Sequence, residues 1–188
     1  MEDCNVHGGA KLAVVKSDIC KYFEKHGSSP RHVFLCAGSN DIFPKCDRTK
    51  PRPTLTEEDI DIYYTNKRDE ITQNIDAIEE RITSYNSKTT VTWCTVPPRL
   101  NIDKGEESVF MWLNQELVHR NNLHHRSTPE IHRTIVRYRK YGGDPEPVYC
   151  GAKSGRFVED GVHPTQTTAD GWTEEIIQSI RKLIDETN

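Results

Sequence analysis

The chain has 188 residues, of which 29% are charged and 34% hydrophobic, with a formal net charge of −4. This length allows one domain with a sizeable core. No apolar run approaches the ~20 residues of a membrane span, and the acidic stretch after Met1 is unlike a signal peptide. The composition therefore predicts a soluble, cytoplasmic protein that makes no use of a membrane and is no general nucleic-acid binder.

Apolar spacing predicts helices and strands that alternate along the chain. A helical period covers residues 11–25, 69–85, 109–117 and 172–184, and an N-cap with acidic residues behind it stands at Thr56. Runs of β-branched and apolar residues predict strands at 33–37 and 89–96, with a possible short third strand at 148–150. This alternation is typical of an α/β layer protein with a parallel sheet, in which ligands sit beyond the carboxyl ends of the strands.

The six cysteines include no CxxC pair and no zinc spacing. We expect reduced structural thiols, with Cys36 and Cys94 buried in strands. His124 and His125 are adjacent, but no carboxylate or cysteine spacing supports a metal there. The sequence therefore predicts neither a metal nor a cofactor.

Three short polar segments lie where strands end or helices begin. An Asp three residues before a His offers a carboxylate that can hold an imidazole in one tautomer, which is the orienter–base half of a hydrolytic triad. The segments are His7-Gly8-Gly9-Ala10, Gly38-Ser39-Asn40-Asp41 and Asp160-Gly161-Val162-His163-Pro164-Thr165.

This set, in this order, resembles the second, third and fifth conserved blocks of the SGNH (GDSL-type) hydrolases, from about Asn5 to the C-terminus. The run Thr95–Arg99 is similar to a strand end of that family, and its Pro-Pro-Arg also resembles retrotransposon-type esterase domains. The resemblance implies a three-layer α/β/α, flavodoxin-like fold as a single domain over residues 1–188. It implies hydrolysis of an acyl or acetyl ester of a small molecule or carbohydrate.

The resemblance also implies residue roles. A backbone N–H of Gly8 or Gly9 and the side-chain amide of Asn40 would face a developing oxyanion. His163 would be the general base and Asp160 its orienter. Asp41 is expected to cap a helix or turn instead of acting as a catalytic acid.

The chain departs from this family in one respect. The family's nucleophile lies in a Gly-Asp-Ser segment after the first strand, upstream of the glycine block, and here only seven residues precede Gly8. We therefore expect a truncated domain without its first strand, inactive or incomplete as a hydrolase. Ser39 occupies a variable position and is not expected to be the nucleophile. The strand at Val33 would then expose an apolar edge, which favours self-association.

Plainer interpretations remain open. Gly8-Gly9 can be a tight turn, Asn40 a turn residue and His163 a surface loop residue. The basic stretch at 119–140 is either a solvated face or a site for RNA or a protein. A non-catalytic SGNH-like module that binds RNA or protein is therefore the alternative function.

Overall fold

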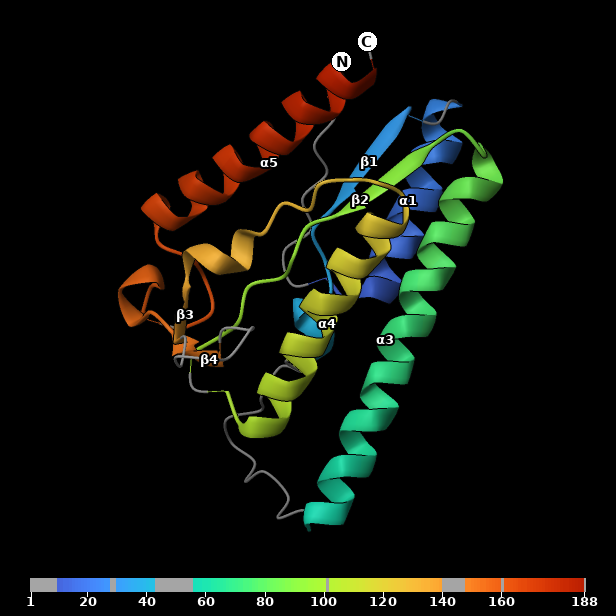
Figure 1. Cartoon of the computed structure of the whole chain (residues 1–188). Helices are drawn as coiled ribbons and strands as arrows, with labels where there is room; N and C mark the ends of the chain where they lie inside the picture. The colour runs from blue at the N-terminus through green and yellow to red at the C-terminus, as the bar shows by residue number, and fades with distance from the viewer. Residues whose placement is uncertain are drawn as a thin grey trace. The chain divides into compact units, whose positions relative to one another are not determined.

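The computed structural model describes residues 10–27, 30–42, 56–100, 102–139, 148–159 and 161–187. The chain divides into two compact units, Met1–Val91 and Thr92–Asn188. Figure 1 labels their helices and strands. The predicted α/β class is confirmed, since helices alternate with a two-stranded parallel sheet. That residues 1–188 form a single domain stays a prediction.

Helix α1 (Leu12–His26) forms where the sequence predicts a helix, and it buries Leu12 and Phe23. It ends at Gly27, whose φ of 61° lies in the left-handed region and whose N–H donates to Phe23 O at 3.0 Å. Glycine reaches this conformation without the steric cost that a Cβ brings, so it closes the helix. The Phe23 ring meets Tyr85 of α3 edge-on, with 4.8 Å between ring centroids.

Helix α3 (Glu57–Tyr85) unites the predicted N-cap and the predicted helix at 69–85 in a single element of 29 residues. Thr56 and Asp59 form a reciprocal capping box at its start, which confirms the N-cap. Four isoleucines on one face have no exposed surface, namely Ile71, Ile75, Ile78 and Ile82. Helix α3 packs against α1, and the four isoleucines place the apolar period of the sequence in the core of this unit.

The parallel sheet consists of β1 (His32–Leu35) and β2 (Thr90–Trp93), both at the predicted positions but shorter than predicted. The pairing begins where the Thr90 N–H donates to Arg31 O at 3.1 Å. The short helix α2 (Ser39–Ile42) follows β1, so polar residues stand at the carboxyl end of that strand.

Helix α4 (Lys104–Leu123) buries four apolar residues, Val109, Phe110, Leu113 and Leu117. Two asparagines of its buried face, seven residues apart, bond to the chain at the end of β2. The Asn121 amide accepts from Trp93 N–H at 3.0 Å and donates to Trp93 O at 2.8 Å. Asn114 does the same for Val96, at 2.7 and 3.1 Å. These side chains satisfy buried backbone groups that a neighbouring strand would otherwise satisfy.

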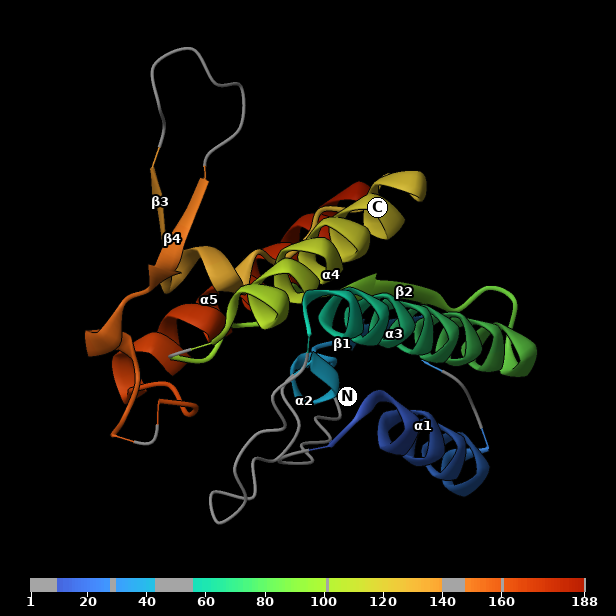
Figure 2. The ribbon, with the colours of Figure 1, turned by 90° about the horizontal axis from the view of Figure 1, so that it is seen from below.

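A second sheet pairs β3 (Val136–Arg139) with β4 (Val148–Ala152) in antiparallel fashion, with an irregularity between Val136 and Tyr138 (Figure 2). The strand predicted at 148–150 therefore exists, but it is no third strand of the parallel sheet. Its partner β3 lies inside the basic stretch 119–140, where we predicted no strand. The four-residue β3 was missed because it is too short to show a clear period.

The terminal helix α5 (Gln166–Thr187) confirms the prediction made from its apolar spacing. Its Trp172 indole N–H donates to Thr134 Oγ1 at 2.9 Å, which fastens α5 to the 3₁₀ turn Ile131–Thr134. A second 3₁₀ turn, Ser154–Arg156, precedes it. Within the described residues, no helix has the length and apolar character needed to span a bilayer.

Candidate functional site

The Gly38–Ile42 turn holds the first group of predicted site residues. Gly38 is buried with φ of 114°, a conformation that side chains rarely permit, and its carbonyl accepts from Asp41 N–H at 3.0 Å and Ile42 N–H at 3.3 Å. The chain thus turns sharply from β1 into α2. Asn40 and Asp41 are delivered just beyond the strand tip.

Asn40 is half-buried, and its amide nitrogen donates to Ala10 O at 3.2 Å. The amide thus faces the segment that directly precedes α1. That segment continues the sequence of Gly8 and Gly9, which both lie outside the described residues. The predicted role of these glycines as oxyanion donors stays a prediction.

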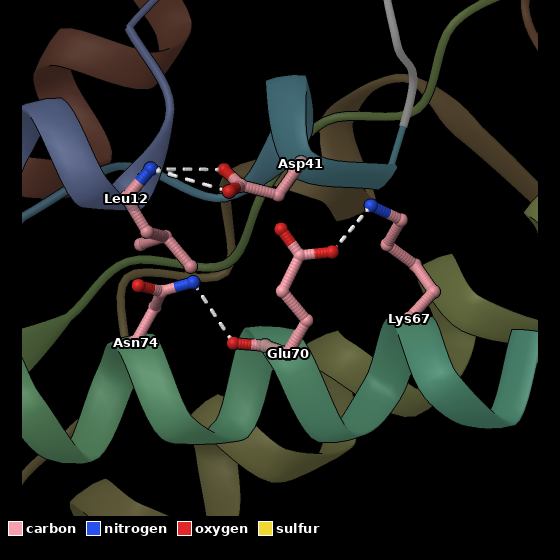
Figure 3. Close-up of polar contacts among 5 residues, drawn as sticks. All are labelled: Leu12, Asp41, Lys67, Glu70 and Asn74. Atoms are coloured by element: carbon pink, nitrogen blue, oxygen red, sulfur yellow. Dashed lines mark hydrogen bonds and ion pairs between the residues drawn. The ribbon is translucent and has the colours of Figure 1, made fainter.

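Asp41 is a helix cap, as predicted, but the helix that it caps lies about thirty residues earlier in the chain. Its carboxylate accepts the Leu12 N–H at 3.0 Å for Oδ2 and 3.3 Å for Oδ1 (Figure 3). Lys11, the residue at the N-cap position of α1, makes no capping bond with its own side chain. Asp41 is only 3% exposed, and this burial raises the pKa of its carboxyl, although the Leu12 bond and the Lys11 charge act in the opposite direction.

His163 stands in a closely bonded loop directly before α5. Its carbonyl accepts from Val158 N–H at 3.0 Å, and the neighbouring Pro164 forms an antiparallel bridge with Phe157. The His163 side chain is exposed. Asp160, its predicted orienter, lies outside the described residues, so the Asp–His pair stays a prediction.

Gly161 fastens this loop to the chain that follows β2. Its φ is 68°, and its carbonyl accepts from Leu100 N–H at 2.9 Å. A Cβ at Gly161 would be strained by the positive φ and would stand only 3.1 Å from the Leu100 Cβ, so glycine suits this position. The loop of His163 is therefore held against the segment that follows β2 in the chain.

The structure describes Asn40 and His163 in different units of the chain. Their predicted convergence on one reacting atom stays a prediction.

The basic stretch 119–140 contains groups that the sequence could not distinguish from one another. Arg120 bonds to Glu116 at 2.7 Å, and Arg133 pairs with Glu130. His132 is buried and so is not part of a solvated face, and burial lowers its pKa to about 4. Its Nδ1 lies 2.8 Å from Thr95 Oγ1. His132 is thus part of the core of its unit.

The cysteines are partly as predicted. Cys94 is buried at 1% exposure, as expected for a small apolar side chain, but Cys36 is exposed because β1 ends one residue earlier. Cys20 is half-buried, and its sulfur accepts from Arg81 Nε at 3.2 Å. All three are free thiols. Among the described residues, no three His, Cys, Asp or Glu side chains gather as metal ligands do.

Comparison with known proteins gives a fold likeness. No family model and no curated protein matches the chain. The crystal structure of a carbohydrate esterase family 3 from Talaromyces cellulolyticus is similar, with a TM-score of 0.60 and 14% sequence identity, over 96% of this chain and 70% of that one. At this identity the likeness concerns the fold alone, and it shows that the chain shares the mixed α/β fold of that structure.

Proposed function

We propose that the chain carries the base and oxyanion groups of an SGNH-type ester hydrolase. His163 is the general base, oriented by Asp160, and Asn40 donates to the oxyanion together with Gly8 or Gly9. The observation that carries the proposal is the fold likeness to a carbohydrate esterase, combined with an exposed His163 on a closely bonded loop before the last helix.

The same likeness supports a proposal for the substrate class. The substrate we propose is an acyl or acetyl ester on a carbohydrate or another small alcohol. Two or three N–H donors aimed at the carbonyl oxygen lower the barrier because they meet the negative charge as it develops. His163 then takes the proton of the attacking hydroxyl and returns it to the leaving alcohol.

The attacking hydroxyl is the part of this chemistry that the 188 residues do not supply, since they contain no Gly-Asp-Ser segment. Ser39 begins α2, and we assign it no nucleophilic role. Since the members of a triad act as a unit, we expect the purified chain to hydrolyse a simple aryl acetate weakly or not at all.

The test supplies the nucleophile. A segment of an active SGNH esterase, from its first strand to its glycine block, is fused ahead of the chain, and aryl acetate hydrolysis is measured. The fusion should turn over, and His163→Ala should abolish the turnover. Asn40→Ala should lower it by roughly 10²–10³. His119→Ala, which changes an exposed histidine of α4, is the matched control and should have no effect.

Two outcomes would contradict the proposal. A folded, active fusion whose turnover is indifferent to His163→Ala would show that His163 is no base. Turnover by the unfused chain that disappears in His163→Ala would place the nucleophile inside these 188 residues, and Ser39 would be the first serine to replace.

A further inference from the structure

Two neighbouring side chains of the Gly38–Ile42 turn bond to the same short segment at the start of α1. The Asn40 amide donates to Ala10 O at 3.2 Å. The Asp41 carboxylate accepts from Leu12 N–H at 3.0 Å. Residues 10–12 are therefore held by two bonds from adjacent positions. If the bond between Asp41 and Leu12 is broken, we expect the Ala10 carbonyl to move. The Asn40 amide would then no longer be held in one orientation by its bond to that carbonyl.

A charged carboxylate at the buried position of Asp41 costs free energy. Its side chain is 3% exposed. The charged groups that face it come from the residue before α1 and from α3. Lys11 precedes α1, while Glu70 and Lys67 lie on α3 and bond to each other at 2.7 Å (Figure 3). Burial outweighs the favourable groups and raises the pKa of Asp41.

The direction of this shift has a consequence for stability. Because the folded-state pKa of Asp41 lies above its ordinary value of 3.8, the folded chain holds the proton more tightly, and stability falls as the pH rises through the folded-state pKa. A neutral amide at this position could accept the same N–H without that cost.

We propose that Asp41 is a positioning residue for the oxyanion-binding amide of Asn40. Its buried carboxylate clamps the first turn of α1 to the Gly38–Ile42 turn and so fixes the Ala10 carbonyl on which the Asn40 amide is aligned. A planar amide with one N–H bonded to a fixed carbonyl has its second N–H fixed in direction as well. The inference rests on the proposed function, because it assigns Asn40 to the oxyanion.

The clamp depends on charge. A carboxylate at a helix N-terminus forms a charge-assisted bond and meets the positive end of the helix dipole, and both contributions weaken when it is protonated. Acidification should therefore loosen the Ala10–Leu12 segment and change the environment of the Asn40 amide. An Asp41→Asn chain, which keeps an acceptor but has no charge to lose, should not respond in this way.

The test follows the Asn40 side-chain NH₂ signals by ¹⁵N NMR in the free, full-length chain, assigned by their loss in Asn40→Ala. In Asp41→Ala the signals should move toward those of an exposed amide, and exchange of the Leu12 N–H should accelerate roughly tenfold. Asp59→Ala is the matched control, since it removes an exposed carboxylate that caps α3 and should leave the Asn40 signals unmoved. Unmoved Asn40 signals in a folded Asp41→Ala chain would overturn the inference.

If Asp41→Ala does not fold, the pH titration of Asp41→Asn decides. Asn40 signals that respond to acid in the parent and not in Asp41→Asn support the clamp. An equal response in both overturns it. These signals are read without substrate, so an inactive fusion with an intact clamp would refute the proposed function alone. An active fusion with no coupling between Asp41 and Asn40 would refute this inference alone.

Discussion

Mild acid should destabilise the Thr92–Asn188 unit through His132. This side chain is 7% exposed, with its Nδ1 2.8 Å from Thr95 Oγ1. Thr95 Oγ1 also lies 3.2 Å from Pro129 O, so the neutral ring has a hydrogen-bond partner at Nδ1 within the core. A second proton would create a buried cation close to the Phe110 ring, whose centroid is 6.3 Å away.

The magnitude follows from the pKa. Burial, and next the charge of Arg133, lower the pKa of His132 from 6.5 to about 4. Since the folded-state pKa is depressed, the unfolded chain takes the proton first. The full stability is present above pH 6.5 and is lost progressively as the pH falls toward 4. The difference corresponds to about 3 kcal/mol, which is a large part of the stability of a small domain.

The assay is urea unfolding from pH 7.5 to pH 4, followed by tryptophan fluorescence. All three tryptophans, Trp93, Trp112 and Trp172, belong to this unit, so the signal reports on it directly. His132→Asn places an amide near the ring Nδ1 and does not titrate. It should be less stable at pH 7.5, because it loses ring packing, but it should lose less stability toward pH 4. A variant with the same pH dependence as the parent would refute the reasoning.

Three further changes test local geometry by the same unfolding assay. His125 has a φ of 55° at the end of α4, so His125→Gly should raise stability by about 0.5–1 kcal/mol, and a loss would contradict the strain. Asn121→Ala strands a buried N–H and C=O of β2 and should cost about 2–4 kcal/mol, whereas the exposed Asn122→Ala should cost little. Gly161→Ala meets Leu100 at 3.1 Å in a left-handed conformation and should cost about 1–3 kcal/mol; a neutral effect would show that the loop is not held there.

The helices could be predicted because the apolar residues that each helix buries recur at regular spacing within one short segment of the sequence. The isoleucines of α3 and the apolar spacing of α5 produce a period within a single segment, and Thr56 marks its own helix start. The fold class followed from the order of these elements. The boundary of β1 was less predictable, because exposure of Cys36 depends on where pairing with β2 stops.

The contacts that a single segment cannot reveal were missed. Asp41 caps a helix about thirty residues away, and Asn121 bonds to a strand 28 residues away, so neither has a local signal. His132 lies among basic residues in the sequence, yet its ring is buried and its neighbour Arg133 is on the surface. In each case the role of the residue depends on contacts with residues far away in the sequence.

The proposed site requires Asn40 and His163 to serve one reacting atom, and an experimental structure of the chain would test this by the separation of the two side chains. A reacting atom must lie about 3 Å from each group, so the Asn40 amide nitrogen and the His163 ring should stand within about 10 Å of each other, with Asp160 on the far side of the ring. A larger separation in a folded chain would contradict the proposed site, whatever its activity.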